Sequence, residues 1–216
     1  MTRPDHLDDH DLGFAHDLPR LLNRRRLLGA MGASFAMGAA TPSLAADCVA
    51  LPWETAGPYP ADGSNGRGTR VINALNQSGI LRQDLRASFN GMEGTADGVK
   101  LDLELTLVAA DGCTPLVGRA VYLWHCDAIG RYSLYDLPDT NYLRGLGVSD
   151  ASGVVRFTTI FAGCYPGRWP HIHFEVFDGV ELAVAGVAAT LTAQIALPEA
   201  ACTEIFQDRG YSGSPR

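Results

Sequence analysis

Leucine alternates strictly with polar residues through positions 100–107 of this 216-residue chain, in the order Lys-Leu-Asp-Leu-Glu-Leu-Thr-Leu. Period two is the spacing of side chains on one face of a β-strand, so the leucines share one face and the polar groups share the other. A strand that is half buried in this way is typical of an antiparallel sheet. We therefore expect sheets that each cover a core with one face.

Further short strands are predicted at residues 119–125, 154–160 and 191–197, which are rich in β-branched and aromatic residues and are bounded by Gly, Asp and Pro turns. Residues 198–206 predict a short helix, because a proline suits its first turn. No series of long helices alternates with these strands. The sequence therefore predicts a mainly β fold, a single-domain antiparallel β-sandwich with long loops.

Two further features of the sequence have a structural interpretation that rests on the residues alone. Residues 53–68 are rich in glycine and proline and are expected to form an irregular loop. His125 shares its strand face with Val121 and Leu123, while Tyr122 and Trp124 lie on the other face. We therefore interpret His125 as a hydrogen-bonded core histidine rather than a metal ligand.

Residues 161–177, FAGCYPGRWPHIHFEVF, gather the chemistry-bearing side chains of the chain. His171, His173 and Glu175 alternate with apolar residues, so a strand would aim both imidazoles at one face. Their Cα atoms would then lie about 7 Å apart, close enough for both rings to reach one metal ion. Two half-buried histidines that are satisfied by hydrogen bonds are the alternative.

Two tyrosines and an arginine lie near this pair in the predicted fold. Tyr165 and Arg168 precede His171 in a turn made by Pro166, Gly167 and Pro170, and such a turn folds Tyr165 back towards the strand. A second tyrosine, Tyr132, also follows a strand and a turn.

These residues resemble a known family. Gly130-Arg131-Tyr132, Tyr165-Pro166 and Arg168-x-x-His171-x-His173-Phe174 are similar to the motifs of the intradiol ring-cleavage dioxygenases, the catechol and protocatechuate 3,4-dioxygenase family. The resemblance covers roughly residues 53–206 and is densest from 118 to 177. It implies a β-sandwich fold, in agreement with the strand pattern.

The resemblance makes Tyr132, Tyr165, His171 and His173 the ligands of an iron ion. Tyrosine has a solution pKa near 10 and binds as tyrosinate only when a strong Lewis acid displaces its proton. Two phenolates beside two imidazoles suit Fe(III) better than zinc or copper. The expected cofactor is therefore Fe(III).

The implied activity is that of a non-haem Fe(III) intradiol dioxygenase, an oxidoreductase whose partners are a small aromatic diol and O₂. A catechol-type diol would be cleaved between its two hydroxyl-bearing carbons to a cis,cis-muconate-type dicarboxylate. Tyr165 would give way to the substrate and accept one of its protons, and Arg168 would stabilise developing negative charge. Tyr59 and Gln194 match residues of the substrate pocket, which Arg168 also borders.

Two other functional classes are weighed against this one. An exported β-sandwich protein that binds a metal or a carbohydrate without catalysis is the alternative, and a C-terminus shorter than is usual in the family is compatible with it. A zinc hydrolase fits less well, because hydrolytic zinc sites favour three histidines or two histidines and a glutamate.

The first 46 residues read as a twin-arginine signal peptide, followed by one domain over residues 47–216. Asn23-Arg24-Arg25-Arg26-Leu27-Leu28 precedes an apolar run of about 14 residues, which is shorter than the roughly 20 that a membrane helix needs. The protein is thus expected to be exported to the periplasm or the exterior, with no stable membrane anchor after cleavage. A homo-oligomer stays open.

Charge and cysteine content add two expectations. The net charge is −7, and residues 47–216 keep that value with one lysine, so nucleic acid is not an expected partner. Five cysteines in an exported chain allow at most two disulfides. The resemblance suggests Cys48 with Cys113 and Cys164 with Cys202, and leaves Cys126 as a thiol.

Overall fold

The computed structural model describes residues 48–214, and the predicted signal peptide at residues 1–46 lies outside them. The elements of this part, in chain order, are β1 (Asp62–Arg67), β2 (Arg70–Asn73), β3 (Lys100–Thr106), β4 (Ala120–Trp124), β5 (Arg144–Val148), β6 (Val154–Ile160), β7 (His171–Phe177), α2 (Val180–Val184), β8 (Leu191–Ala196), α3 (Glu199–Ile205) and η3 (Arg209–Tyr211). The predicted mainly β class is confirmed. No helix within residues 48–214 has the length and apolar character needed to cross a membrane.

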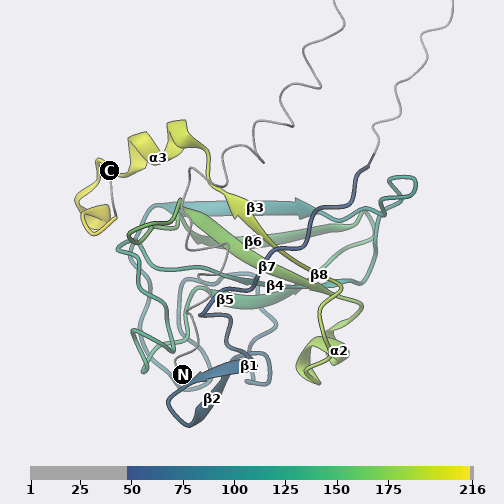
Figure 1. Ribbon diagram of the computed structural model, residues 1–216, viewed down its shortest axis with the longest axis horizontal. Helices are drawn as coiled ribbons and strands as arrows, with labels where there is room; N and C mark the ends of the chain where they lie inside the picture. Colours follow the sequence, from purple (N-terminus) through teal and green to yellow (C-terminus); the bar gives the residue numbers. More distant parts are fainter. Residues whose placement is uncertain (1–47, 215–216) are drawn as a thin grey trace, which may run out of the picture.

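Two antiparallel sheets face each other. Strand β3 pairs with β6, and the other sheet has the order β5-β4-β7-β8 (Figure 1). Leucines of β3 and Phe157 of β6 meet Leu123 of β4 and Phe174 of β7 in the main hydrophobic core between the sheets. This packing is the predicted β-sandwich.

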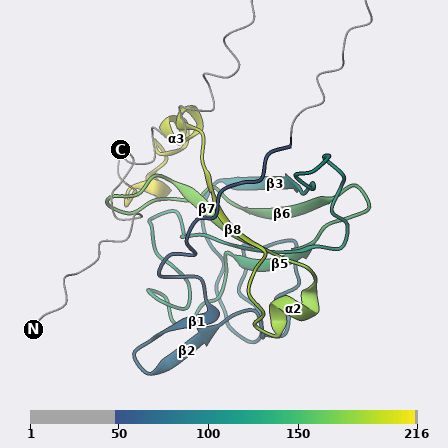
Figure 2. The ribbon, with the colours of Figure 1, turned by 45° about the vertical axis from the view of Figure 1, so that its right-hand side comes forward.

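The other face of the four-stranded sheet is also covered. Tyr122 and Trp124 of β4 pack there against Ile72, Leu75 and Ile80, which belong to the segment that contains the β1–β2 hairpin. Figures 1 and 2 show this hairpin on the side of the sheet away from β3 and β6. All seven residues of β7 are buried, because the strand lies beneath cover on both faces.

Most predicted elements are present. Strands predicted at 100–107, 119–125, 154–160 and 191–197 correspond to β3, β4, β6 and β8, and the helix predicted at 198–206 is α3 with Pro198 at its N-cap. The prediction of an irregular loop over residues 53–68 was wrong for its last part, which forms strand β1. This strand pairs with β2 in a hairpin whose register is irregular between Asp62 and Gly66. Strand β5 and helix α2 had no predicted counterpart.

His125 is a core residue, as predicted. Its Nδ1 lies 2.8 Å from the carbonyl oxygen of Cys126 and therefore donates, so its Nε2 accepts from the Thr159 hydroxyl at 2.7 Å. Burial lowers the pKa of His125 to about 4. The ring is thus neutral near pH 7 and serves the fold.

The cysteine pairing was half right. Cys48 and Cys113 form the expected disulfide, and Cys126 is the expected buried thiol. The prediction of a disulfide between Cys164 and Cys202 was wrong, because both residues are buried thiols. The Cys202 thiol donates instead to the carbonyl oxygen of Leu197, and burial raises its pKa to about 11.

Candidate metal centre

The predicted ligands lie on the outer face of the four-stranded sheet. His173 of β7 is the register partner of Trp124 on β4 and of Gln194 on β8. His171 lies two residues earlier on the same strand, so the pleat of β7 directs both imidazoles to this face. Ile172 points the other way, into the core between the sheets.

The two imidazoles meet edge to face. Their ring centroids lie 4.6 Å apart and their Nε2 atoms 3.0 Å apart. The Nδ1 atom of His171 lies 2.5 Å from the Trp169 carbonyl oxygen and donates to it, which leaves the Nε2 lone pair directed towards His173. Two nitrogens bound at about 2.1 Å and at a right angle to one ion would be about 3.0 Å apart, so this spacing fits a shared metal.

Both tyrosines converge on the histidines. The ring centroid of Tyr165 lies 6.0 Å from that of His171 and 5.9 Å from that of Tyr132. Tyr132 is only 1% exposed, and its hydroxyl oxygen is buried with no hydrogen-bond partner of normal geometry among residues 48–214. A buried polar atom in this condition points to a group that would complete it.

Burial sets the protonation of these phenols. It raises the pKa of Tyr132 well above its ordinary value, and it also raises the pKa of Tyr165, although the nearby Arg168 guanidinium opposes the second shift. Both hydroxyls are therefore protonated near pH 7 unless a cation replaces the proton. Such a replacement requires a strong Lewis acid.

The donor set fits a hard trivalent ion. Residues 48–214 contain no group of three or more His, Cys, Asp or Glu side chains that could hold a metal ion. A metal bound at His171 and His173 would therefore depend on the tyrosine oxygens. Phenolate oxygens with imidazole nitrogens suit Fe(III) better than zinc, which favours histidine, cysteine and carboxylate ligands.

Close backbone packing holds the two tyrosine loops together. Asp127 fixes the turn after β4 by accepting hydrogen bonds from the backbone N–H groups of Ile129 and Arg131, at 3.0 and 2.9 Å. Gly130 follows with a φ of +88°, and a Cβ atom there would lie 2.5 Å from the Cys164 carbonyl oxygen. Only glycine satisfies both conditions, and this contact brings Tyr132 beside Tyr165.

The predicted pocket residues border the same site. Arg168 donates to the Gln194 side-chain oxygen at 2.7 Å, and the Gln194 amide lies 3.4 Å from the Thr55 carbonyl oxygen. The Tyr59 ring stacks on that of Tyr132 with a centroid distance of 4.6 Å. The seven predicted site residues thus come together from β7, β8 and three loops.

Two further residues of the site face were not predicted as functional. Trp124 stacks on the His173 ring, with centroids 5.0 Å apart and planes within 3°. Arg144 of β5 pairs in register with Trp124 and is fully buried. The alternation of residues 119–125 already placed Trp124 on the face opposite Leu123, and that face proved to carry the site.

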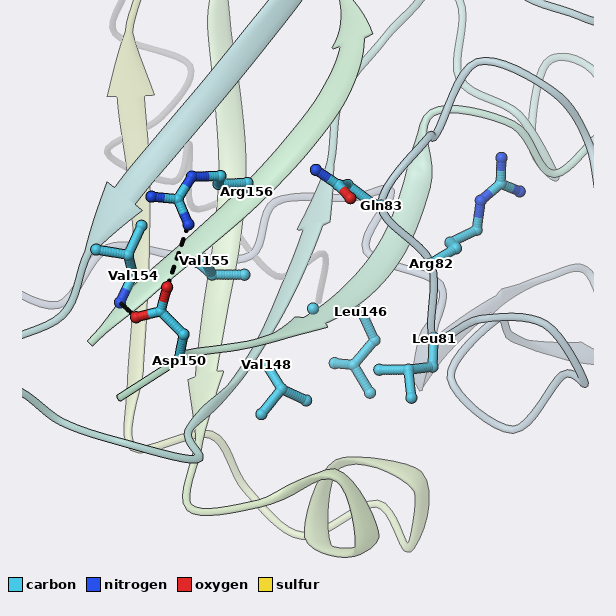
Figure 3. A pocket seen from close by; sticks show the side chains of 10 residues that line it. Leu81, Arg82, Gln83, Leu146, Val148, Asp150, Val154, Val155 and Arg156 are labelled. Atoms are coloured by element: carbon cyan, nitrogen blue, oxygen red, sulfur yellow. Dashed lines mark hydrogen bonds and ion pairs between the residues drawn. The ribbon is translucent and has the colours of Figure 1, made fainter. Parts of the chain in front are cut away.

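An open groove of about 400 Å³ lies elsewhere, between the segment of residues 81–83 and the edges of β5 and β6 (Figure 3). Leu146 and Val155 line it, and Asp150 forms an ion pair with Arg156 at its rim. None of the seven predicted site residues lines this groove, which therefore is not part of the candidate centre.

Sequence comparison points to a dioxygenase family. Residues 74–180 match the model of the family described as Dioxygenase_C. The protocatechuate 3,4-dioxygenase beta chain of Burkholderia cepacia is 32% identical over 128 residues, a match that covers 45% of this chain and 54% of the relative. These matches support the intradiol dioxygenase family. The chain spans about half the length of this curated relative.

Solved structures support the same family. An intradiol ring-cleavage dioxygenase from Tetranychus urticae aligns with a TM-score of 0.58 and 27% identity over 78% of this chain and 74% of its own. A second solved dioxygenase aligns with a TM-score of 0.59 and 25% identity over 78% and 76% of the two chains. The mostly β, antiparallel architecture agrees with the intradiol dioxygenase fold. The alternative of a non-catalytic binding protein is not favoured.

The Gly130 contact predicts a specific loss of stability. The substitution Gly130→Ala should strain a left-handed backbone, at about 1 kcal/mol, and should add a clash with the Cys164 carbonyl worth about 1–3 kcal/mol more. Gly186→Ala is the matched control, because Gly186 has a φ of +73° and no atom lies within 4 Å of its added Cβ. Urea unfolding of both variants measures the difference. Equal losses would contradict the proposed contact between the two loops.

Proposed function

We propose that this protein is an Fe(III)-dependent intradiol dioxygenase that cleaves a catechol-type aromatic diol with O₂ to a cis,cis-muconate-type dicarboxylate. The observation that carries the proposal is the convergence of two imidazoles, one buried phenol and one partly buried phenol on one sheet face. The family matches support the same reaction class.

Four side chains would hold the iron. The Nε2 atoms of His171 and His173 and the phenol oxygens of Tyr132 and Tyr165 supply two neutral and two anionic donors. Two tyrosinates offset two of the three charges of Fe(III), which lowers the free energy needed to bury the ion. When bound, the ferric ion supplies the Lewis acidity that makes an aromatic diol reactive towards O₂.

The two tyrosines are suited to different tasks. Tyr132 is almost completely buried, beneath Tyr59, and is expected to remain an anionic ligand throughout. Tyr165 is only partly buried and lies near the Arg168 guanidinium. Its phenolate oxygen would accept one of the two hydroxyl protons of the entering diol, and that proton offsets one of the negative charges that the deprotonated diol would bring.

Three pocket residues would orient the ring and stabilise charge. The Arg168 guanidinium, held by its hydrogen bond to Gln194, places a positive charge where the reacting ring becomes electron-rich. Tyr59, which stacks on Tyr132, offers an aromatic surface to the substrate.

The visible spectrum tests the ligand set. The iron-loaded protein should absorb visible light through tyrosinate-to-ferric charge transfer, and Tyr132→Phe and Tyr165→Phe should each weaken or shift the band. Tyr211→Phe is the control, because Tyr211 is buried among Phe161 and Phe206, in the main core. A fully iron-loaded protein without a visible band would exclude tyrosinate ligation.

We also propose that the protein is exported through the twin-arginine route. Support comes from Arg24 and Arg25 before the apolar run of residues 27–40. Replacing both arginines with lysine should keep the precursor in the cytoplasm, as cell fractionation would detect. Unchanged export of that variant would contradict this route.

A further inference from the structure

Arg144 is an unusual residue for the centre of a fold. It is fully buried in β5, and none of the ion pairs among residues 48–214 includes it. A buried guanidinium lowers stability by several kcal/mol unless its N–H groups are satisfied. The groups that satisfy it therefore indicate what this charge holds in place.

The donors of Arg144 reach two loop segments that are far apart in sequence, and Nη1 also lies 3.4 Å from the Tyr122 hydroxyl oxygen on β4. Its Nη1 atom donates to the carbonyl oxygens of Tyr59 and Pro60, both at 2.9 Å. Its Nε and Nη2 atoms donate to the hydroxyl and the carbonyl oxygen of Ser133, at 3.0 and 2.9 Å. One planar side chain thus joins the pocket segment of residues 59–60 to the residue that follows the ligand Tyr132.

The two joined segments carry rings that touch each other. Tyr59 stacks on Tyr132 at 4.6 Å, and Tyr135 meets the Tyr59 ring edge-on at 5.2 Å. The Arg144 guanidinium also lies over the Tyr135 ring, 5.5 Å from its centroid. The buried Arg144 side chain therefore fixes the position of the backbone at both Tyr59 and Tyr132.

We infer that Arg144 is a positioning residue that holds Tyr59 against Tyr132 and so aligns the substrate-facing ring with the ligand set. This inference rests on the proposed function. Lysine cannot replace arginine in this role, because an ammonium is a point donor and cannot span the planar fork from Tyr59 to Ser133. The charge alone is thus not sufficient.

The first test needs no iron and no substrate. In Arg144→Lys, amide hydrogen exchange should increase in peptides that cover residues 53–66 and 131–136 while β3 and β6 stay protected. Arg156→Lys is the matched control, because Arg156 is an exposed arginine of β6 that pairs with Glu104 and Asp150. Unchanged exchange in both peptides would overturn the inference, whatever the protein's activity.

The second test uses the iron-loaded enzyme and catechol. Arg144→Lys should lower kcat/KM by about 10- to 100-fold, the scale of a misplaced pocket group, and the loss should fall mainly on KM. The double variant with Arg144→Lys and Tyr59→Leu should lose kcat/KM by a factor clearly smaller than the product of the factors lost by the two single variants. Independent, multiplying effects or an unchanged KM would overturn the inference. A wild-type enzyme without turnover contradicts the proposed function instead, and leaves the exchange test to decide on Arg144.

Discussion

The structure depends on β7 being buried on both faces. Ile172, Phe174 and Val176 enter the core between the sheets, while His171 and His173 reach the outer face, because side chains alternate along a strand. Hydrophobic burial on one face therefore fixes the register that places the imidazoles on the other. A shift by one residue would turn the histidines into the core and the apolar side chains to the outer face. The packing of the core and the assembly of the site therefore depend on the same register.

The loops around β7 act through burial. They cover Tyr132 so completely that its phenol has no hydrogen-bond partner of normal geometry among the described residues, and its pKa rises well above the ordinary value. A phenol in this setting is a poor acid in the apoprotein and becomes an anion only when a metal replaces its proton. The buried Arg144 guanidinium donates hydrogen bonds to the carbonyl oxygens of Tyr59 and Ser133, and it thereby connects these two loops.

Sequence patterns predicted the parts of the fold that have strong periodicity. Alternation located β3 and β4, and β-branched and aromatic composition between turns located β6 and β8. The motif of residues 161–177 located the histidines, Tyr165 and Arg168. Strand β5 escaped because its sequence, Arg-Gly-Leu-Gly-Val, contains two glycines and a buried arginine, which are all unfavourable signals for a strand. Arg144 was missed because its structural role lies in contacts with Tyr59 and Ser133, and no local sequence pattern shows such contacts. The pairing of Cys164 with Cys202 rested on the family resemblance alone and was wrong, because both residues are buried thiols in this chain.

The position of ring cleavage tests the central claim most directly, because ferric iron held by tyrosinates is expected to open the ring between the hydroxyl-bearing carbons. Purified, iron-loaded protein should be given catechol and isotopically labelled O₂, with no reductant and no nicotinamide. The account predicts cis,cis-muconate with one labelled oxygen atom in each new carboxylate. A yellow semialdehyde, formed by cleavage beside the diol, would contradict it, and so would the absence of O₂ uptake across a broad panel of catechols.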